Sequence, residues 1–234
     1  MGMEFPAYLA TMPLHAITEV YGESGLRERF LVEIRRFTPD EQTRLRAALD
    51  LVARLHSDDR RVREPYLNHL LRVATRMVHH YEVRDVDVIV AGLLHDSVED
   101  HADELGGGTE VALATLAERF GGRTARLVAA VTNPEYDPDR DAHEQYREHV
   151  ARSLDREPWA RVIKVSDFTD NGVGLMHTTG PKVLKLANKY RPLVPVFREL
   201  IGRTDTPLSR LVKQHIFGQL DKADERFRAI LDGV

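Results

Sequence analysis

Apolar residues recur every three or four positions along most of the chain, whereas the alternation of apolar and polar residues that is typical of strands is short and scarce. This pattern predicts an all-α fold. The clearest helix start is Thr38-Pro39-Asp40-Glu41, a capping box with proline at the first helical position, and the helix should run to about Leu55. Its apolar face comprises Leu45, Ala48, Leu51, Val52 and Leu55.

Glycine and proline divide the rest of the chain into further segments. Gly121-Gly122 should end one helix, and Thr132-Asn133-Pro134 should begin a polar loop to about Asp141, which with Gly106-Gly107-Gly108 is a candidate mobile rim. Proline marks the start or interruption of the later helices. Helices are expected over 66–81, 86–98, 110–120 and 123–131, from Pro158, from Pro181 with an interruption at Pro192 and Pro195, and over 208–231 after Thr206-Pro207.

The chain shows no repeat and no obvious linker, so we expect one globule. Residues 1–45 should form a helical extension packed on the core, because Leu26, Phe30, Leu31 and Ile34 share helical spacing. Residues 46–203 should form the main domain. Residues 204–234 should add a C-terminal helix to the same globule, where it caps the domain or serves a homo-oligomer interface.

Composition narrows the chemistry. The 234 residues are 42% hydrophobic and 30% charged, which is enough to bury a large core. The absence of cysteine excludes disulfides, thiolate metal sites and cysteine nucleophiles, so any metal must be held by His, Asp or Glu. A net charge of −4 gives no reason to expect nucleic acid as a partner. The first 20 residues resemble neither a signal peptide nor a membrane anchor, which predicts a cytoplasmic protein.

The octapeptide LLHDSVED, residues 93–100, places four ionisable side chains directly behind an apolar run. On one continuous helix His95 and Glu99 lie one turn apart, as do Asp96 and Asp100, so all four groups should point the same way. Burying an unpaired charge in a core lowers the free energy of unfolding by roughly several kcal/mol, and a bound divalent cation would offset that loss. A His-Asp pair alone is weak evidence, so further ligands must come from other segments.

Three segments together resemble the HD-domain phosphohydrolases, and within them the hydrolase domain of the RelA/SpoT alarmone enzymes and their small single-domain relatives. The matching motifs are RxxxxPYxxH at 60–69, LLHDxVED at 93–100 and KxxDxxxN at 164–171, and Tyr190-Arg191-Pro192-Leu193 is similar to a later IYxPL element. The likeness runs from about residue 51 to residue 200. It implies an all-α HD-domain helical bundle for the main domain.

The resemblance also implies roles for individual residues. It implies a metal site made by His69, His95, Asp96 and Asp167, with Mn²⁺ favoured and Fe²⁺ or Mg²⁺ as alternatives. It implies a catalytic acidic pair, Glu99 and Asp100, beside the metal. Substrate contacts are expected from Arg60 near the base and phosphates, Asn171 near the ribose, Arg61 and Lys164 near the phosphates, and Tyr190, which is either a pocket residue or a core aromatic.

The expected activity is removal of the 3′-pyrophosphate from (p)ppGpp, which yields GDP or GTP. The sequence departs from the family pattern at three places that affect substrate recognition. Arg63 stands where the family usually has glycine, and Phe168-Thr169-Asp170-Asn171 stands in place of the family's RLHN motif. In the family's HxGQxR motif the histidine lies five places before the arginine, whereas His56 lies four places before Arg60. A first alternative is therefore hydrolysis of another nucleotide, such as (p)ppApp, a nucleoside phosphate or the 2′-phosphate of NADPH. A second alternative is a catalytically silent module that binds a nucleotide.

Overall fold

The computed structural model describes residues 7–174 and 181–233, and none of these residues lies in a strand. An isolated bridge pairs Arg60 with Pro65. The all-α prediction is confirmed. The α-helices are α1 (Leu14–Glu33), α2 (Pro39–Leu55), α3 (Leu67–His79), α4 (Val86–Leu94), α5 (Ser97–His101), α6 (Gly108–Phe120), α7 (Gly122–Val131), α8 (Ala142–Arg156), α9 (Pro158–Gly174), α10 (Pro181–Tyr190), α11 (Leu193–Gly202) and α12 (Arg210–Asp232), with short 3₁₀ turns at Ala7–Ala10 and Ile34–Arg36.

Local signals explain several of the helix boundaries. The capping box is present: the backbone N–H of Glu41 donates to Thr38 Oγ1, and the Glu41 carboxylate accepts from the backbone N–H of Thr38 at 2.8 Å. Gly121 ends α6 with φ +91°, a left-handed conformation that favours glycine. The helix after Pro181 is interrupted between Tyr190 and Leu193, at Pro192, as expected.

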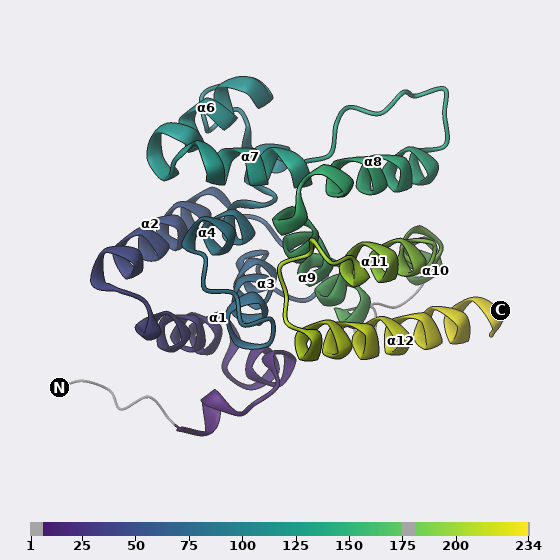
Figure 1. Ribbon diagram of the computed structural model, residues 1–234, viewed down its shortest axis with the longest axis horizontal. Coiled ribbons are helices and arrows are strands. Elements are labelled where there is room, and N and C mark those ends of the chain that lie inside the picture. Colours follow the sequence, from purple (N-terminus) through teal and green to yellow (C-terminus); the bar gives the residue numbers. More distant parts are fainter. Residues whose placement is uncertain (1–6, 175–180, 234) are drawn as a thin grey trace.

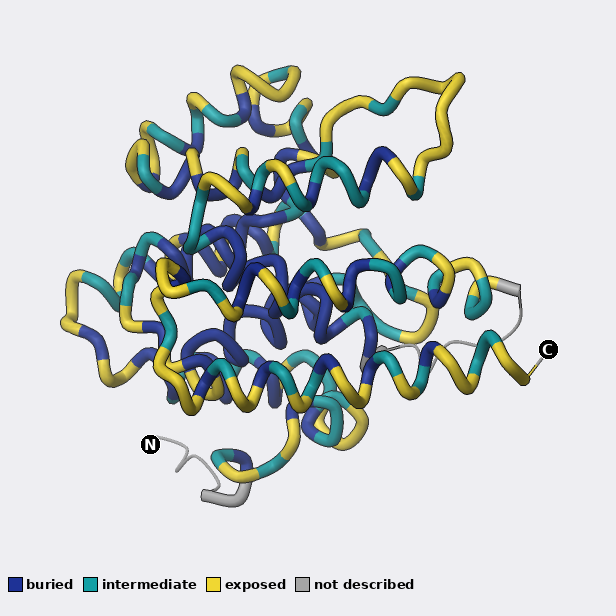
Figure 2. Tube along the Cα trace, turned by 45° about the vertical axis from the view of Figure 1, so that its right-hand side comes forward, coloured by how far each residue is buried: buried dark blue, intermediate teal, exposed yellow. Residues whose placement is uncertain are grey.

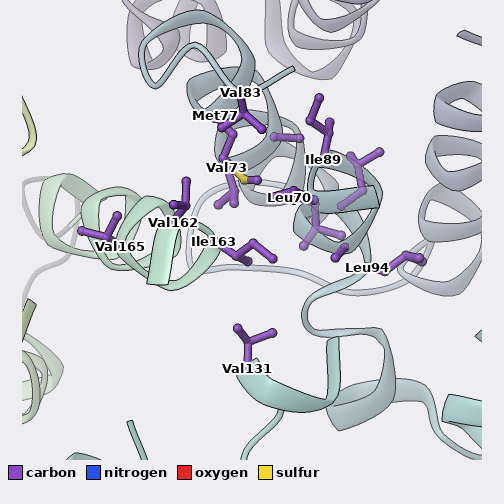
Figure 3. Close-up of a cluster of buried hydrophobic side chains, with 14 of the residues drawn as sticks. Leu70, Val73, Met77, Val83, Ile89, Leu94, Val131, Val162, Ile163 and Val165 are labelled. Carbon is purple, nitrogen blue, oxygen red and sulfur yellow. The ribbon is translucent and has the colours of Figure 1, made fainter. Parts of the chain in front are cut away.

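Helices α3, α4 and α9 form the centre of the molecule, and the other helices pack around them (Figure 1). In Figure 2 the central segments are almost entirely buried, while the outer helices are buried on one side only. Figure 3 shows Leu70 and Met77 of α3 in one cluster with Ile89 of α4, Ile163 of α9 and Val131 of α7. This cluster fixes α3, α4 and α9 relative to one another. The position of these helices matters because His69, His95, Asp96 and Asp167 lie on them or directly after them.

Helix α1 packs against α3 and is bent at Gly22, whose φ and ψ are 59° and −148°. Only glycine, which has no side chain, adopts this backbone conformation readily. Helix α12 packs on α9, α10 and α11, along the lower edge in Figure 1. The division of the chain at residues 45 and 203 stays a prediction.

Three sequence-based boundaries need correction. The expected helix over 86–98 is two helices: α4 ends at Leu94 and α5 begins at Ser97. Asp96 between them, with φ −99° and ψ −6°, stays in the right-handed region but departs from ideal helix dihedrals. The last helix begins at Arg210, since the Ser209 side chain accepts from the N–H of Val212. Helix α8 was not predicted, although the Asp141 side chain caps it by accepting from Glu144 N–H at 2.7 Å.

Candidate metal centre and its pocket

Four side chains from three parts of the core meet at one point. His69 comes from α3, His95 and Asp96 from the bend between α4 and α5, and Asp167 from α9. The Nε2 atom of His69 lies 3.3 Å from Asp167 Oδ1, and the Nε2 atom of His95 lies 3.8 Å from the same oxygen. Asp96 Oδ2 lies 3.0 Å from His95 Nε2 and 3.7 Å from His69 Nε2.

The two imidazoles are oriented as metal ligands. His95 Nδ1 lies 2.9 Å from the carbonyl oxygen of Gly92, and a proton on Nδ1 leaves the lone pair of Nε2 directed at the carboxylates. That Nε2 is buried and has no hydrogen-bond partner among the described residues. The Nδ1 atom of His69 likewise lies 2.8 Å from Asp170 Oδ2. His69, His95 and Asp167 can therefore hold a divalent cation, and Asp96 lies within reach of the same point.

Without a cation, the burial of these charged groups carries a free-energy cost. Burial by itself lowers the pKa of the His95 imidazole, but Asp96 and Asp167 outweigh burial and raise that pKa to about 10. Burial opposes ionisation of Asp167, yet Lys164 and the two histidines hold its pKa well below the usual range. A proton on His95 thus takes the place that a cation would fill, and metal binding releases that proton.

A buried carboxylate that the sequence reasoning did not assign, Asp170, supports His69 from behind. Arg72 Nε donates to Asp170 Oδ1 at 2.9 Å, and Arg76 Nη2 donates to the same oxygen at 3.0 Å. Arg72 also donates to both Glu64 oxygens, at 2.7 and 2.6 Å. The available signal was three polar residues at helical spacing within α3, which is buried over most of its length: His69, Arg72 and Arg76 at positions i, i+3 and i+7.

Of the four ionisable residues of LLHDSVED, His95 is buried, Asp96 is half-buried, and Glu99 and Asp100 are exposed. The expectation that one helix aims all four groups the same way is wrong, because the bend at Asp96 separates the two pairs. The side-chain amide of Asn133 donates to Glu99 Oε1 and Oε2 at 2.8 and 2.9 Å. Asn133 is a second residue that the sequence reasoning did not assign to the site. Partial desolvation and the charges of Asp96 and Glu99 raise the pKa of Asp100 to about 6.

A cavity of about 790 Å³ lies beside the metal-ligand cluster. Arg60, Arg61, Asn171 and Tyr190 line it, while their roles as substrate contacts stay predictions. Asn171 links the cavity to the cluster, because its amide donates to Asp167 Oδ1 at 2.6 Å and its oxygen accepts from Arg61 at 2.5 Å. Tyr190 is nearly buried and packs edge-on against Phe168.

Lys164 differs from the other expected substrate contacts. It does not line the cavity; it is buried, with Nζ 3.2 Å from Asp167 Oδ2. Glu19 and Glu23 of α1 do line the cavity. The wall therefore combines arginines with carboxylates from a helix outside the region of resemblance.

Comparisons with known proteins show which family the chain resembles in sequence and in fold. The sequence model of the family described as HD domain matches residues 48–156. The chain is an HD-domain protein. The solved structure described as a metazoan ortholog of SpoT that hydrolyses ppGpp superposes with a TM-score of 0.60 at 23% identity, over 78% of this chain and 94% of that chain, which shows the fold. No described helix is long and apolar enough to cross a membrane.

The HD-domain protein is related by sequence to proteins named guanosine-3′,5′-bis(diphosphate) 3′-pyrophosphohydrolase. It is 33% identical over 130 residues to MESH1 of Homo sapiens, covering 54% of this chain and 66% of that protein. It is 35% identical over 103 residues to MESH1 of Danio rerio, covering 44% and 51%. It is 29% identical over 178 residues to the protein of Aquifex aeolicus, covering 74% and 24%. The match thus spans one half to two thirds of the MESH1 relatives.

Proposed function

We propose that this HD-domain protein is a metal-dependent phosphohydrolase that removes the 3′-pyrophosphate from (p)ppGpp, giving GDP or GTP. The observation that carries the proposal is the cluster of His69, His95, Asp96 and Asp167, joined through Asn171 to an arginine-bearing cavity. The names of the MESH1 and Aquifex relatives support this substrate. The substrate is then a nucleotide in the cavity, with its 3′ side towards the cluster.

The four clustered residues would hold the metal ion, for which we favour Mn²⁺ over Fe²⁺ or Mg²⁺. When bound, such an ion polarises the phosphate and lowers the pKa of water from about 15.7 towards ~7. The Tyr66 hydroxyl donates to Asp96 Oδ2 at 2.7 Å, which fixes the orientation of that carboxylate. Lys164 fixes Asp167 in the same way, so we assign Lys164 a positioning role through Asp167.

Glu99 and Asp100 would orient the attacking water and pass its proton to the leaving group. Asn133 holds both oxygens of Glu99, so the loop after α7 places this base. Arg60 and Arg61 would neutralise the charge that develops on the phosphates. Arg61 is held in place through Asn171, whereas Arg60 is exposed at the cavity wall.

A specific observation supports the alternative of another nucleotide. Glu19 and Glu23 on the cavity wall repel anions, and this favours a substrate with fewer phosphates than ppGpp. Candidates are a nucleoside monophosphate and NADPH. (p)ppApp carries the same phosphates as (p)ppGpp and would differ only at the base.

The test is a parallel incubation of metal-stripped protein, with and without Mn²⁺, with ppGpp, ppApp, NADPH and nucleoside monophosphates. Mn²⁺-dependent loss of ppGpp in preference to the other compounds is the expected result. Preference for another nucleotide would keep the metal chemistry and overturn the substrate assignment. Tight nucleotide binding without turnover of any compound would instead favour the silent binding module.

A further inference from the structure

A second group of metal-binding side chains lies outside the cluster described above. His56 follows the end of α2, Asp59 belongs to the segment that precedes the cavity wall, and His101 is the last residue of α5. His56 Nδ1 lies 2.7 Å from Asp59 Oδ2, His101 Nε2 lies 2.7 Å from the same oxygen, and the two nitrogens are 3.2 Å apart. Three donor atoms from three segments therefore form a small triangle.

We propose that His56, Asp59 and His101 bind a second divalent transition-metal ion of the Zn²⁺ or Co²⁺ class. Tetrahedral ligands about 2.0–2.2 Å from such an ion lie roughly 3.4 Å apart. The two 2.7 Å sides of the triangle would therefore open by about 0.7 Å and the 3.2 Å side by about 0.2 Å. Two imidazoles and one carboxylate suit these borderline ions better than Ca²⁺ or Mg²⁺, which prefer oxygen ligands. Three protein ligands leave a fourth position for water.

The two histidines of this site are buried, whereas its carboxylate can be reached from solvent. The two histidines are buried, with 1% and 8% of their surface exposed, while the Asp59 side chain is 35% exposed, so an ion can enter past Asp59. The other ring nitrogen of His101, Nδ1, lies 3.2 Å from Glu104 Oε1, the arrangement that orients a ligating imidazole. His56 is held differently, because its ring stacks on Tyr66 with centroids 5.0 Å apart.

The position of this group suggests what the ion would do. The segment from His56 to Tyr66 carries Arg60 and Arg61 of the cavity wall, and α5 carries Glu99 and Asp100. An ion bound by His56, Asp59 and His101 would join these two segments. The site is therefore structural: it fixes the substrate wall relative to the acidic pair. Metal binding at this site can be tested separately from the proposed activity, because none of its ligands belongs to the first cluster.

The test counts Co²⁺ ions bound to the metal-stripped full chain by equilibrium dialysis, with visible absorption reporting the ligand geometry. We expect two ions per chain in the wild type, one in Asp59→Asn and two in Asp58→Asn. Asp58 is the matched control, since it is the exposed neighbour and loses the same charge. His101→Asn, with its fold checked by circular dichroism, should also bind one ion, and Glu104→Gln should bind the second ion about 10–100-fold more weakly.

The first site is followed separately with Asp96→Ala. If that variant loses one ion while Asp59→Asn loses the other, both sites are present. If Asp96→Ala loses none and Asp59→Asn loses one, the second site stands and the metal chemistry of the proposed function fails. Equal Co²⁺ binding by the wild type and folded Asp59→Asn and His101→Asn would overturn the second site.

Discussion

At the scale of single residues, Asp170 shows how one buried carboxylate is kept ionised. It accepts hydrogen bonds from Arg72 and Arg76 and faces His69 Nδ1, and these partners hold its pKa well below the usual range against the effect of burial. Neutralising Asp170 would leave Arg76 without a carboxylate partner among the described residues, and would leave Arg72 with Glu64 alone. Such a loss within a buried ion pair destabilises proteins strongly.

We therefore expect Asp170→Asn to lower the free energy of unfolding by about 3–5 kcal/mol. Urea denaturation at neutral pH measures this. The control is Asp221→Asn, whose carboxylate pairs with Arg198 at the surface and is 62% exposed, so that its loss should have little effect. Equal effects of the two substitutions would show that the Asp170 network contributes no special stability.

Glu99 should matter for chemistry and not for binding. It is exposed on α5 and held by Asn133, with no contact to the arginines of the cavity wall among the described interactions. Glu99→Gln should lower kcat for ppGpp by about 10²-fold or more and leave the nucleotide Kd unchanged. Steady-state kinetics and isothermal titration separate the two quantities. An unchanged kcat would remove Glu99 from the mechanism.

The four residues of the candidate metal centre could be picked out from the sequence because they lie in short motifs whose order and spacing resemble a known family. Asp170 and Asn133 could not, since their roles depend on partners that are distant in sequence. Arg72 lies 98 residues from Asp170, and Glu99 lies 34 residues from Asn133. Such pairings are set by the packing of α3 on α9 and of α5 near the loop after α7, which no local pattern reveals.

At the scale of elements, LLHDSVED is a bend between two helices. The bend lets the segment bury His95 at the end of α4 and expose Glu99 on α5. Periodicity predicted one helix because both halves have helical spacing and no proline or glycine stands between them. The interruption instead coincides with Asp96, whose carboxylate faces the histidines and accepts from Tyr66. A demand of the site has overridden a local propensity here.

The start of α4 is tied to its neighbours by charge. Asp87 in its first turn pairs with Arg44 of α2 at 2.5 Å and with Arg123 of α7 at 3.1 Å. Burial alone would raise the pKa of Asp87, but the two arginines outweigh it and hold the pKa below 3.8. A carboxyl whose pKa is depressed by folding adds stability above its unfolded pKa and loses that contribution as the pH falls through the folded value.

Asp87→Asn should accordingly lower the free energy of unfolding by about 1 kcal/mol at pH 7, a value discounted because all three side chains are partly exposed. The difference from the wild type should shrink towards zero as the pH falls below 3.8. Urea denaturation of both proteins from pH 7 to pH 3 checks this. A difference that stays constant over that range would assign the effect to packing.

At the scale of the whole molecule, the helical fold and the order of most elements followed from periodicity, caps and prolines. Helix α8 did not, since only four of its fifteen residues are buried and its apolar signal is weak. The contribution of α1 to the cavity wall also could not be predicted from the sequence. It requires α1 to pack on α3 and to bend at Gly22, and both are features of the assembled fold.

The whole arrangement serves one purpose in our account. Helices α3 and α9 and the bend after α4 carry the candidate metal ligands at the centre of the fold (Figures 1 and 2). Outer segments add arginines and carboxylates that line the cavity. We propose that this assembly hydrolyses a nucleotide 3′-pyrophosphate with a metal ion. Hydrolysis would then need both the ion and the intact cluster.

The most direct measurement is the product of a single turnover of ppGpp by metal-stripped protein reloaded with Mn²⁺, analysed by anion-exchange chromatography for the wild type and Asp96→Ala. We expect equal amounts of GDP and pyrophosphate from the wild type and none from Asp96→Ala, because the Asp96 carboxylate lies close to both His69 and His95. Intact ppGpp with the wild type, or the same product yield from both proteins, would contradict it.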